Sequence, residues 1–161
     1  MTVEQSERYT IRRLGIDDLA PVFHLGEKLY TLQRNPNLYR MWDATQVVEY
    51  YASDPDGCFV AELNDKIVGF LLSYVVDKHK SKRFYGYLEW LAIHPDHQGK
   101  GLASRLFDRF MKYMRTLKVP MLLVDVEASN EKALSFFLDK GFSRPTSQIY
   151  LTMDLEKKDE R

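Results

Sequence analysis

Cysteine is almost missing from this sequence, which has a single one, Cys58, among 161 residues. No internal disulfide can form, so the fold must rest on its hydrophobic core, as is usual in a reducing cytoplasm. An excess charge of one sign is missing as well, because 23 Lys and Arg balance 23 Asp and Glu. General nucleic-acid binders usually carry a basic excess, so we expect no nucleic-acid partner. Cys58 itself is expected to be a small buried hydrophobe.

Long apolar runs are also missing. No run approaches the roughly 20 residues that cross a bilayer, and the polar residues 1–8 lack the apolar core of a signal peptide. There is no internal repeat, low-complexity tract or Pro/Gly/Ser-rich linker. We therefore expect no membrane segment, a cytoplasmic location and a single domain over 1–161 with its core at about 8–155.

Short apolar segments of two kinds alternate along the chain, with hydrophobic residues making up 45% of the sequence. Alternating patterns predict strands over 9–14, 58–63, 67–77, 84–93, 119–127 and 149–155. A first helical pattern, from Leu19 to Leu32, follows an expected N-cap at Asp17. Three more helices are predicted over 45–52, 99–117 and 130–140. An Asn64–Asp65 turn should join two strands into a hairpin. This order predicts an α/β domain with a mixed sheet and helices on its faces.

The most informative segment, residues 88–103, runs from a strand through a tight turn into a helix. Gly99 and Gly101 lie in the turn, directly before the helical stripe. Glycines allow backbone N–H groups to approach a ligand, and a helix N-terminus offers unpaired donors and partial positive charge. The turn therefore predicts a phosphate cradle with Lys100 at its rim, although its spacing is neither a P-loop nor a G-x-G-x-x-G fingerprint.

The spacing Gln98-x-x-Gly101-x-Ala103 resembles the pyrophosphate signature [QR]-x-x-G-x-[GA] of the GNAT superfamily of acetyl-CoA-dependent N-acetyltransferases. Residues 128–142, ASNEKALSFFLDKGF, are similar to the family's N-x-x-A-x-x-[FL]-Y-x-x-x-G-F segment. The element order also matches, so the resemblance covers about 8–155. It implies the GNAT fold, a mixed, mostly antiparallel twisted sheet splayed into a V and flanked by about four helices.

The resemblance implies acetyl-CoA as cosubstrate and no metal. The backbone of Leu91, Ala92 and Ile93 would bind the pantetheine arm, and Asn130 would contact the pantetheine or the thioester. Phe136 and Phe137 would line the channel near the sulfur. The pyrophosphate would be held by Gln98, Gly99, Lys100, Gly101, Leu102, Ala103 and Ser104. Plainer roles stay open: a simple turn for the glycines, an N-cap for Asn130 and core packing for the phenylalanines.

Amide formation needs a neutral amine, so a general base is expected. The resemblance makes Glu89 the first candidate, followed by Asp125 and Glu127. In relatives that acetylate protein N-termini, a carboxylate at the position of Asp125 acts as the general base. A surface or ion-paired role stays open for all three carboxylates. Phe137 replaces the tyrosine that often protonates the leaving thiolate in this family, and Tyr150 is a substitute candidate.

The acceptor site implied by the resemblance is built by the loop after the first helix and by the last strands. Its candidate residues are Tyr30, Tyr39, Trp42, Trp90 and Glu127. These residue types fit a polyamine or other small amine, a protein N-terminus and a lysine side chain alike, so they pick no substrate. We expect a small-molecule amine acetyltransferase, with protein N-terminal or lysine acetylation as the alternative. A non-catalytic acyl-CoA-binding regulatory module is a further alternative. The resemblance also leaves a homodimer open. His94 and His97 are too few for a zinc site, which needs three or four ligands.

Overall fold

The computed structural model describes residues 8–31, 42–78, 83–143, 145–149, 151, 153 and 155. The chain divides into two compact units, residues 1–125 and 126–161, and the expected single domain remains a prediction. Nearly all the secondary structure belongs to the first unit. In the second unit the described helix is α4, Glu131–Asp139.

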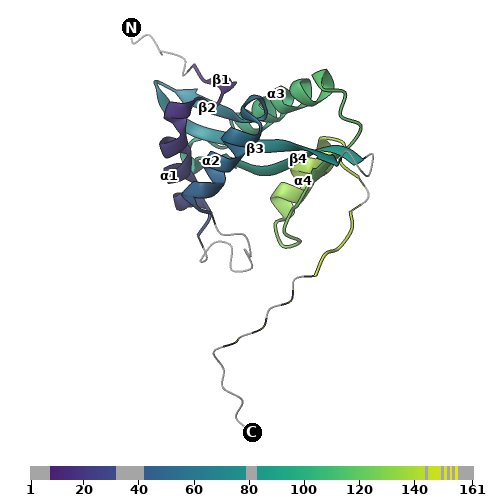
Figure 1. Cartoon of the computed structure of the whole chain (residues 1–161). Coiled ribbons are helices and arrows are strands. Elements are labelled where there is room, and N and C mark those ends of the chain that lie inside the picture. The colour runs from purple at the N-terminus through teal and green to yellow at the C-terminus, as the bar shows by residue number, and fades with distance from the viewer. Residues whose placement is uncertain are drawn as a thin grey trace. The chain divides into compact units, whose positions relative to one another are not determined.

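The first unit is built on a five-stranded sheet in the order β1-β2-β3-β4-β5. Figure 1 labels the first four of these strands. Its strands are β1 Thr10–Arg13, β2 Phe59–Leu63, β3 Lys66–Lys78, β4 Arg83–Ile93 and β5 Leu122–Val124. All neighbours are antiparallel except β4 and β5, which are parallel. The hairpin turn at Asn64 and Asp65 is confirmed, and both residues adopt the positive φ that Asn and Asp tolerate best.

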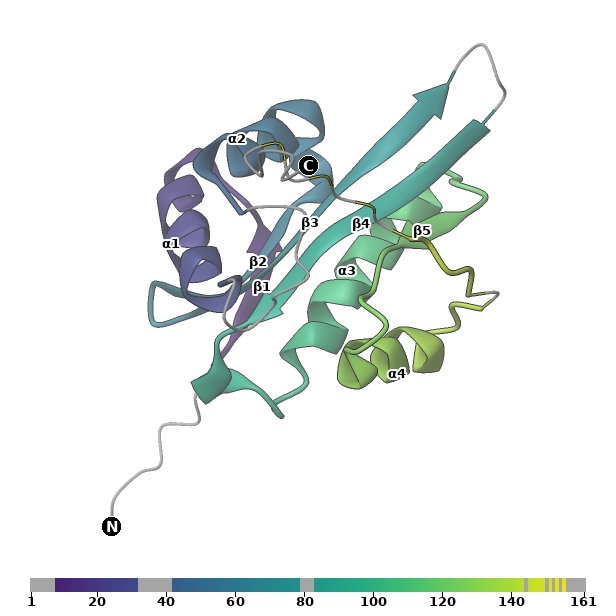
Figure 2. The ribbon, with the colours of Figure 1, turned by 90° about the horizontal axis from the view of Figure 1, so that it is seen from below.

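Helices cover both faces of this sheet. The helices α1, Leu19–Leu29, and α2, Ala44–Ser53, pack on one face, and α3, Leu102–Thr116, packs on the other (Figure 2). Helix α3 turns an apolar side to the sheet and buries Leu102, Leu106, Phe107, Phe110 and Met114. With α4 the described residues contain four α-helices, so the expected α/β fold with a mixed, mostly antiparallel sheet and about four helices is confirmed.

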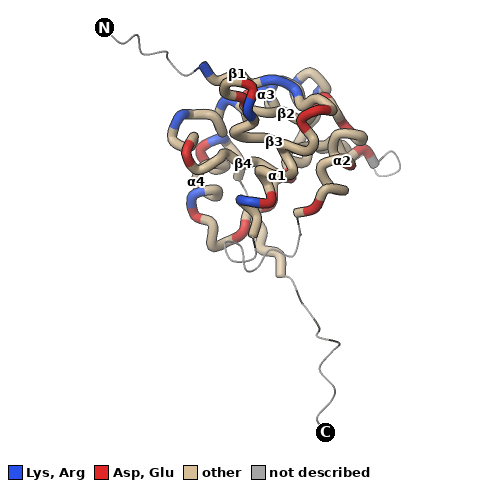
Figure 3. Tube along the Cα trace, turned by 90° about the vertical axis from the view of Figure 1, so that its left-hand side faces the viewer, with Lys and Arg blue, Asp and Glu red and all other residues tan. Residues whose placement is uncertain are grey.

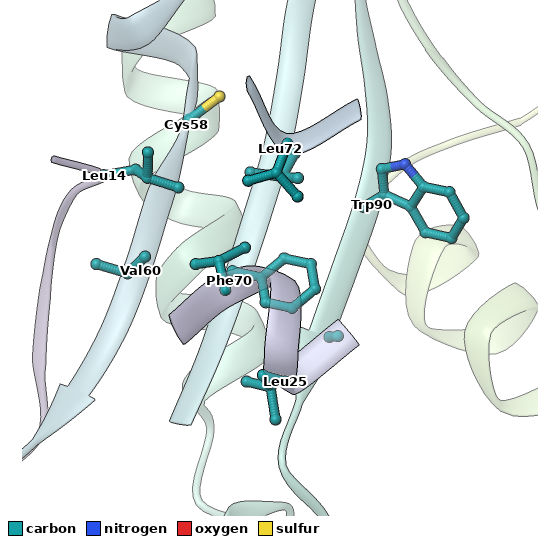
Figure 4. Packing of buried hydrophobic residues seen from close by; sticks show 10 residues of the cluster. Leu14, Leu25, Cys58, Val60, Phe70, Leu72 and Trp90 are labelled. Carbon is teal, nitrogen blue, oxygen red and sulfur yellow. The ribbon is translucent and has the colours of Figure 1, made fainter. Parts of the chain in front are cut away.

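The core between α1, α2 and the sheet is apolar and closely packed. Side chains from α1, β2, β3 and β4 meet there, with Phe70 and Leu72 fully buried at its centre (Figure 4). Cys58 is buried in the same cluster, as expected, and burial raises the pKa of its thiol to about 12. The thiol therefore stays protonated and packs as a hydrophobe.

The described surface carries charges of both signs. Figure 3 shows Lys and Arg interspersed with Asp and Glu along the trace, consistent with a net charge of zero. Among the described residues, no helix has both the length and the apolar character needed to cross a membrane.

Three expectations about element ends are wrong. The residue before α1 is Asp18 rather than Asp17, and its carboxylate accepts hydrogen bonds from the Gly15 N–H and from Arg12. Helix α3 starts at Leu102 rather than at 99, because Gly99 and Gly101 both have positive φ. Strand β5 covers three residues rather than the expected nine, because β4 pairs with it only at Leu122, Leu123 and Val124.

The expected last strand over 149–155 is not formed by the residues of it that the structure describes. Ile149, Leu151, Met153 and Leu155 lie outside any strand and are 82–90% exposed. An isolated segment gains too little from apolar alternation alone, because a strand needs a partner for its backbone groups.

Candidate active site

A bulge in β4 marks the middle of the sheet. Leu72 pairs with Trp90 and Ser73 pairs with Leu88, so Glu89 is the extra residue on the β4 side. The parallel pairing of β4 with β5 covers Gly86 to Leu88. Glu89 and Asp125 each follow the last paired residues, Leu88 and Val124. The bulge and the end of the pairing therefore coincide, as expected for a sheet that splays at this point.

The backbone of β4 beyond the bulge has one neighbouring strand. Leu91, Ala92 and Ile93 pair with β3, and no other strand in the described part of the chain pairs with them. Ala92 and Ile93 are each 9% exposed, and Leu91 is half-buried. An extended ligand arm could therefore add to this side of β4 through backbone hydrogen bonds, as an extra strand would.

The turn after β4 has the conformation that the glycines predict. Gly99 has φ +73° and Gly101 has φ +74°, a region that other residues rarely adopt. The Gln98 side chain ties the turn back to the strand by donating a hydrogen bond to the Ile93 carbonyl at 3.1 Å. A Cβ at either glycine would meet no described atom within 4 Å. The space beside the turn is therefore open at the N-terminus of α3, where a phosphate binds well.

The first turn of α3 contributes unequally to this cradle. The Leu102 side chain is 2% exposed and packs in the core, so only its backbone faces the turn. Ala103 and Ser104 are half-buried. The expected set from Gln98 to Ser104 thus lies together, with Leu102 serving as the anchor that fixes the helix end.

Tyr9 forms part of this rim, which sequence reasoning missed. Lys100 Nζ donates a hydrogen bond to the Tyr9 hydroxyl at 2.8 Å, and that hydroxyl lies 3.0 Å from His97 Nδ1. Arg105 donates to the Tyr9 carbonyl at 2.9 Å. No local pattern could have revealed Tyr9, since it is about 90 residues away from these partners in the chain.

A row of three tyrosine rings leads to the end of β5. Tyr50 of α2 stacks on Tyr74 of β3 at a centroid distance of 5.7 Å, and Tyr74 lies 5.4 Å from Tyr87 of β4. The Tyr87 hydroxyl donates a hydrogen bond to the Asp125 carboxylate. Asp125 is exposed and Glu89 is half-buried. The two first base candidates thus stand where β4 and β5 part.

Beside this row, a cavity of about 230 Å³ lies between α2 and β3. Its lining residues are Glu49, Tyr50, Ser53 and Tyr74. The cavity therefore opens at the start of the tyrosine row, and Asp125 stands at the other end.

The aromatic residues expected in the acceptor site pack instead into the core. Trp90 is 5% exposed, and its ring lies 4.5 Å from Tyr30 and 5.2 Å from Trp42. Trp42 Nε1 donates to the Phe23 carbonyl at 2.9 Å, and the Tyr30 hydroxyl donates to the Leu91 carbonyl at 3.3 Å. Burial raises the pKa of Tyr30, so this hydroxyl keeps its proton. Their substrate-binding role stays a prediction, and in this conformation they brace α1 against β4.

The second unit holds the other expected cofactor residues. Asn130 caps α4 by accepting a hydrogen bond from the Ala133 N–H at 3.1 Å. Phe137 is 7% exposed and packs between Phe136 and Phe142. Asn130 therefore serves as an N-cap and Phe137 packs among aromatic rings. The contacts of these residues with acetyl-CoA stay predictions. Glu127 accepts a hydrogen bond from the Ser129 hydroxyl at 3.0 Å.

Two expected site residues, Tyr39 and Tyr150, lie outside the described residues. Among the residues that are described, no group of three or more His, Cys, Asp and Glu side chains could hold a metal ion.

Comparison with known proteins agrees with this geometry. A family profile described as "Acetyltransferase (GNAT) family" matches residues 26–142. The chain therefore belongs to the GNAT acetyltransferase family, whose members carry out acyl-CoA-dependent acetyl transfer.

Two curated relatives illustrate the range of the family. The chain is 27% identical over 127 residues to an acetyltransferase of Sodalis glossinidius, a match that covers 78% of this chain and 85% of the relative. It is 31% identical over 90 residues to N-alpha-acetyltransferase 30 of Schizosaccharomyces pombe, covering 56% of this chain. That match spans 59% of the relative's length.

Solved structures show the same fold at low sequence identity. An aminoglycoside acetyltransferase from an uncultured soil metagenomic sample superimposes with a TM-score of 0.69 at 23% identity, covering 91% of this chain and 97% of that one. Ard1 from Thermoplasma volcanium superimposes with a TM-score of 0.72 at 18% identity, covering 86% and 84%. The fold is therefore shared by proteins that differ widely in sequence.

Proposed function

We propose that this protein moves the acetyl group of acetyl-CoA to the primary amine of a small molecule, by direct attack of the amine in a ternary complex. The observation that carries the proposal is the coincidence of three features on β4 and its turn. These are the bulge at Glu89, the side of Leu91–Ile93 with which no described strand pairs, and the open glycine turn before α3. The turn would hold the pyrophosphate, and β4 would align the pantetheine so that the thioester lies beside the bulge.

The attacking amine must lose a proton before or during attack. An alkylamine has a pKa near ~10.4, so its neutral form costs roughly 4–5 kcal/mol at pH 7. Glu89 at the bulge and Asp125, which follows β5, are the proposed acceptors of this proton, directly or through water. A backbone N–H near Leu91–Ile93 would polarise the thioester carbonyl.

The leaving thiolate needs no tyrosine of its own. A thiol with a pKa near ~8.5 is a moderate leaving group, so the Phe137 that replaces the family's tyrosine is compatible with turnover. As part of the proposal the enzyme is cytoplasmic, binds neither nucleic acid nor a membrane, and needs no metal for this reaction. A homodimer stays open.

Protein N-terminal acetylation is the second candidate. It is favoured by the similarity to N-alpha-acetyltransferase 30 and by the placement of Asp125, which the Tyr87 hydroxyl orients. An α-amine has a pKa near ~8 and needs less help from a base, which suits an exposed carboxylate.

The test is release of free thiol from acetyl-CoA against a panel of diamines, monoamines, aminoglycosides and short peptides with free N-termini or lysines. Turnover with small amines supports the proposal, and turnover with peptides alone replaces it by the second candidate. Tight CoA binding without turnover on any acceptor would favour the regulatory module. Intersecting initial-velocity lines are expected for a ternary complex, whereas parallel lines would contradict direct attack.

Within that assay, Glu89→Gln and Asp125→Asn separate the two bases. The variant that lacks the working base should lose a factor of about 10²–10⁴ in kcat with little change in CoA affinity. Equal rates in both variants and the wild type would indicate that bulk water, rather than Glu89 or Asp125, accepts the proton.

A further inference from the structure

The cavity between α2 and β3 has the chemistry of a cation site. Its volume of about 230 Å³ compares with roughly 30 Å³ for one water in the liquid. It can therefore take an alkylammonium segment. Its described lining side chains are one carboxylate, one hydroxyl and two phenol rings, and none of these described side chains is a cation.

The aromatic wall of this cavity is ordered by stacking. The rings of Tyr50 and Tyr74 are inclined by 28° at a centroid distance of 5.7 Å. The ring of Tyr74 also contacts that of Tyr87 at a centroid distance of 5.4 Å. The open face of a phenol ring attracts a cation, worth about 0.5–1 kcal/mol at an exposed site and more where water is excluded. Tyr50 and Tyr74 are both half-buried, so a bound cation would be partly desolvated.

Glu49 supplies a formal charge at the same place. It lies on the exposed side of α2, and no described residue forms a hydrogen bond or ion pair with its carboxylate. A carboxylate beside an aromatic wall favours an ammonium group over a neutral one, both by charge and by hydrogen bonding.

The tyrosine row connects this cavity with the place of reaction. It runs in two ring-to-ring steps from Tyr50 to Tyr87, whose hydroxyl reaches Asp125. An acceptor lying along the row would place one end at Glu49 and the other where β4 and β5 part. The spacer between the ends must be several methylenes long to cover these two steps.

We propose that the acceptor carries a second ammonium group, that is, it is a linear diamine or polyamine, and that Glu49, Tyr50 and Tyr74 bind the charge that does not react. This inference rests on the proposed function, since it names the class of small amine. It assigns Glu49 to specificity rather than to catalysis.

The experiment compares diaminoalkanes of increasing length with n-alkylamines of equal length in the thiol-release assay. In the wild type, kcat/KM for long diamines should exceed that for the matched monoamines by about tenfold. Glu49→Gln should lower kcat/KM for diamines about fivefold and leave monoamines unchanged. Raising the ionic strength should shrink the diamine advantage in the wild type only.

Two further sets of variants separate the contributions. Asp65→Asn, in the β2–β3 turn, removes the same charge at a site that tolerates Asn, and it should leave diamine selectivity unchanged. Tyr50→Phe should keep the selectivity, because the ring remains, and Tyr50→Leu should lose it. A melting temperature for each variant identifies any loss that arises from unfolding.

Equal kcat/KM for diamines and monoamines, with or without Glu49, would overturn the inference while the proposed function stands. Turnover of peptides alone would overturn both. If no acceptor turns over, calorimetry of diamine binding to the CoA complex decides. Binding that Glu49→Gln weakens supports the cation site even though the proposed function fails, and absence of such binding overturns both.

Discussion

The hydroxyl of Tyr87 on β4 donates a hydrogen bond to the carboxylate of Asp125, the residue that follows β5. This bond joins the two strands just beyond their last ladder pair, Leu88 with Val124. It holds one candidate base in a fixed orientation at the point where the sheet is expected to receive the thioester. Tyr87 is 8% exposed, so its ring cannot easily swing away.

We therefore predict that Tyr87→Phe weakens turnover more than binding. A hydrogen bond to a charged group contributes about 1.5–3 kcal/mol, so kcat should fall about tenfold or more if Asp125 is the base. The KM for acetyl-CoA should change little. Steady-state kinetics and a pH profile of kcat measure both effects. Tyr85→Phe, two residues earlier on β4, removes a hydroxyl without this contact and serves as the control. An unchanged kcat in Tyr87→Phe would show that this hydrogen bond does not position the base.

Gly101 tests the phosphate cradle. In Gly101→Ala, a residue with a Cβ must adopt φ +74°, which costs roughly 1–2 kcal/mol even though the added Cβ meets no described atom. The Cβ would also project into the space where the pyrophosphate is expected. We predict a lower melting temperature together with a CoA affinity reduced by at least tenfold, measured by calorimetry.

Gly141→Ala is the matched control for this change. Gly141 follows α4 with φ +97° and also has open space around its Cβ position. It should lose stability without losing CoA affinity. Equal affinity losses in the two variants would mean that strain, and not the cradle, controls binding.

Gly26 tests the packing between α1 and the aromatic cluster. Alanine is favoured over glycine by about 1 kcal/mol inside a helix, so propensity alone predicts that Gly26→Ala stabilises the protein. Its Cβ would, however, overlap with the indole ring of Trp42. Overpacking of this kind costs typically 1–3 kcal/mol, so we predict net destabilisation and a shifted tryptophan fluorescence.

A double-mutant cycle separates these two effects. In a Trp42→Leu background the indole no longer stands over Gly26, so Gly26→Ala should become neutral or stabilising there. The free energies of unfolding of the four proteins give the coupling directly. Additive effects would show that the Trp42 indole does not oppose the new methyl group.

Asp18 makes stability depend on pH. Hydrogen bonds from the Arg12 guanidinium, with a further one from the Gly15 N–H, lower the pKa of Asp18 in the folded protein. The unfolded value is near ~3.9, so the contribution is complete above that pH and is lost as pH falls through the lowered folded value. Wild-type stability should therefore decrease on acidification below about pH 4.

Asp18→Asn should remove that part of the decrease. It should also destabilise the protein at neutral pH by about 1–3 kcal/mol, since Arg12 keeps only Glu62 as a partner among the described carboxylates. Urea unfolding at several pH values from 3 to 7 measures both effects. The neighbouring Asp17 is exposed, so Asp17→Asn should follow the wild-type curve. An Asp18→Asn curve parallel to the wild type would contradict this role.

Local features of this protein were predictable from sequence. The turn at Asn64 and Asp65, the glycine turn at 99–101 and the Asn130 cap each depend on residues only a few positions apart. The same holds for the apolar side of α3. Such features follow from backbone preferences and side-chain periodicity, which short segments carry by themselves. They were sufficient to indicate the fold class and the family.

Other features were decided by tertiary contacts. Asp18 rather than Asp17 precedes α1 because Arg12 of β1 binds it, and Trp90 is buried because Tyr30 and Trp42 pack against it. The bulge at Glu89, the contact of Tyr9 with Lys100 and the tyrosine row beside Glu49 join elements far apart in the chain. The sequence by itself thus determined most of the elements and the glycine turn, whereas the tyrosine row was decided by packing. Its residues come from α2, β3 and β4, and no local preference links them.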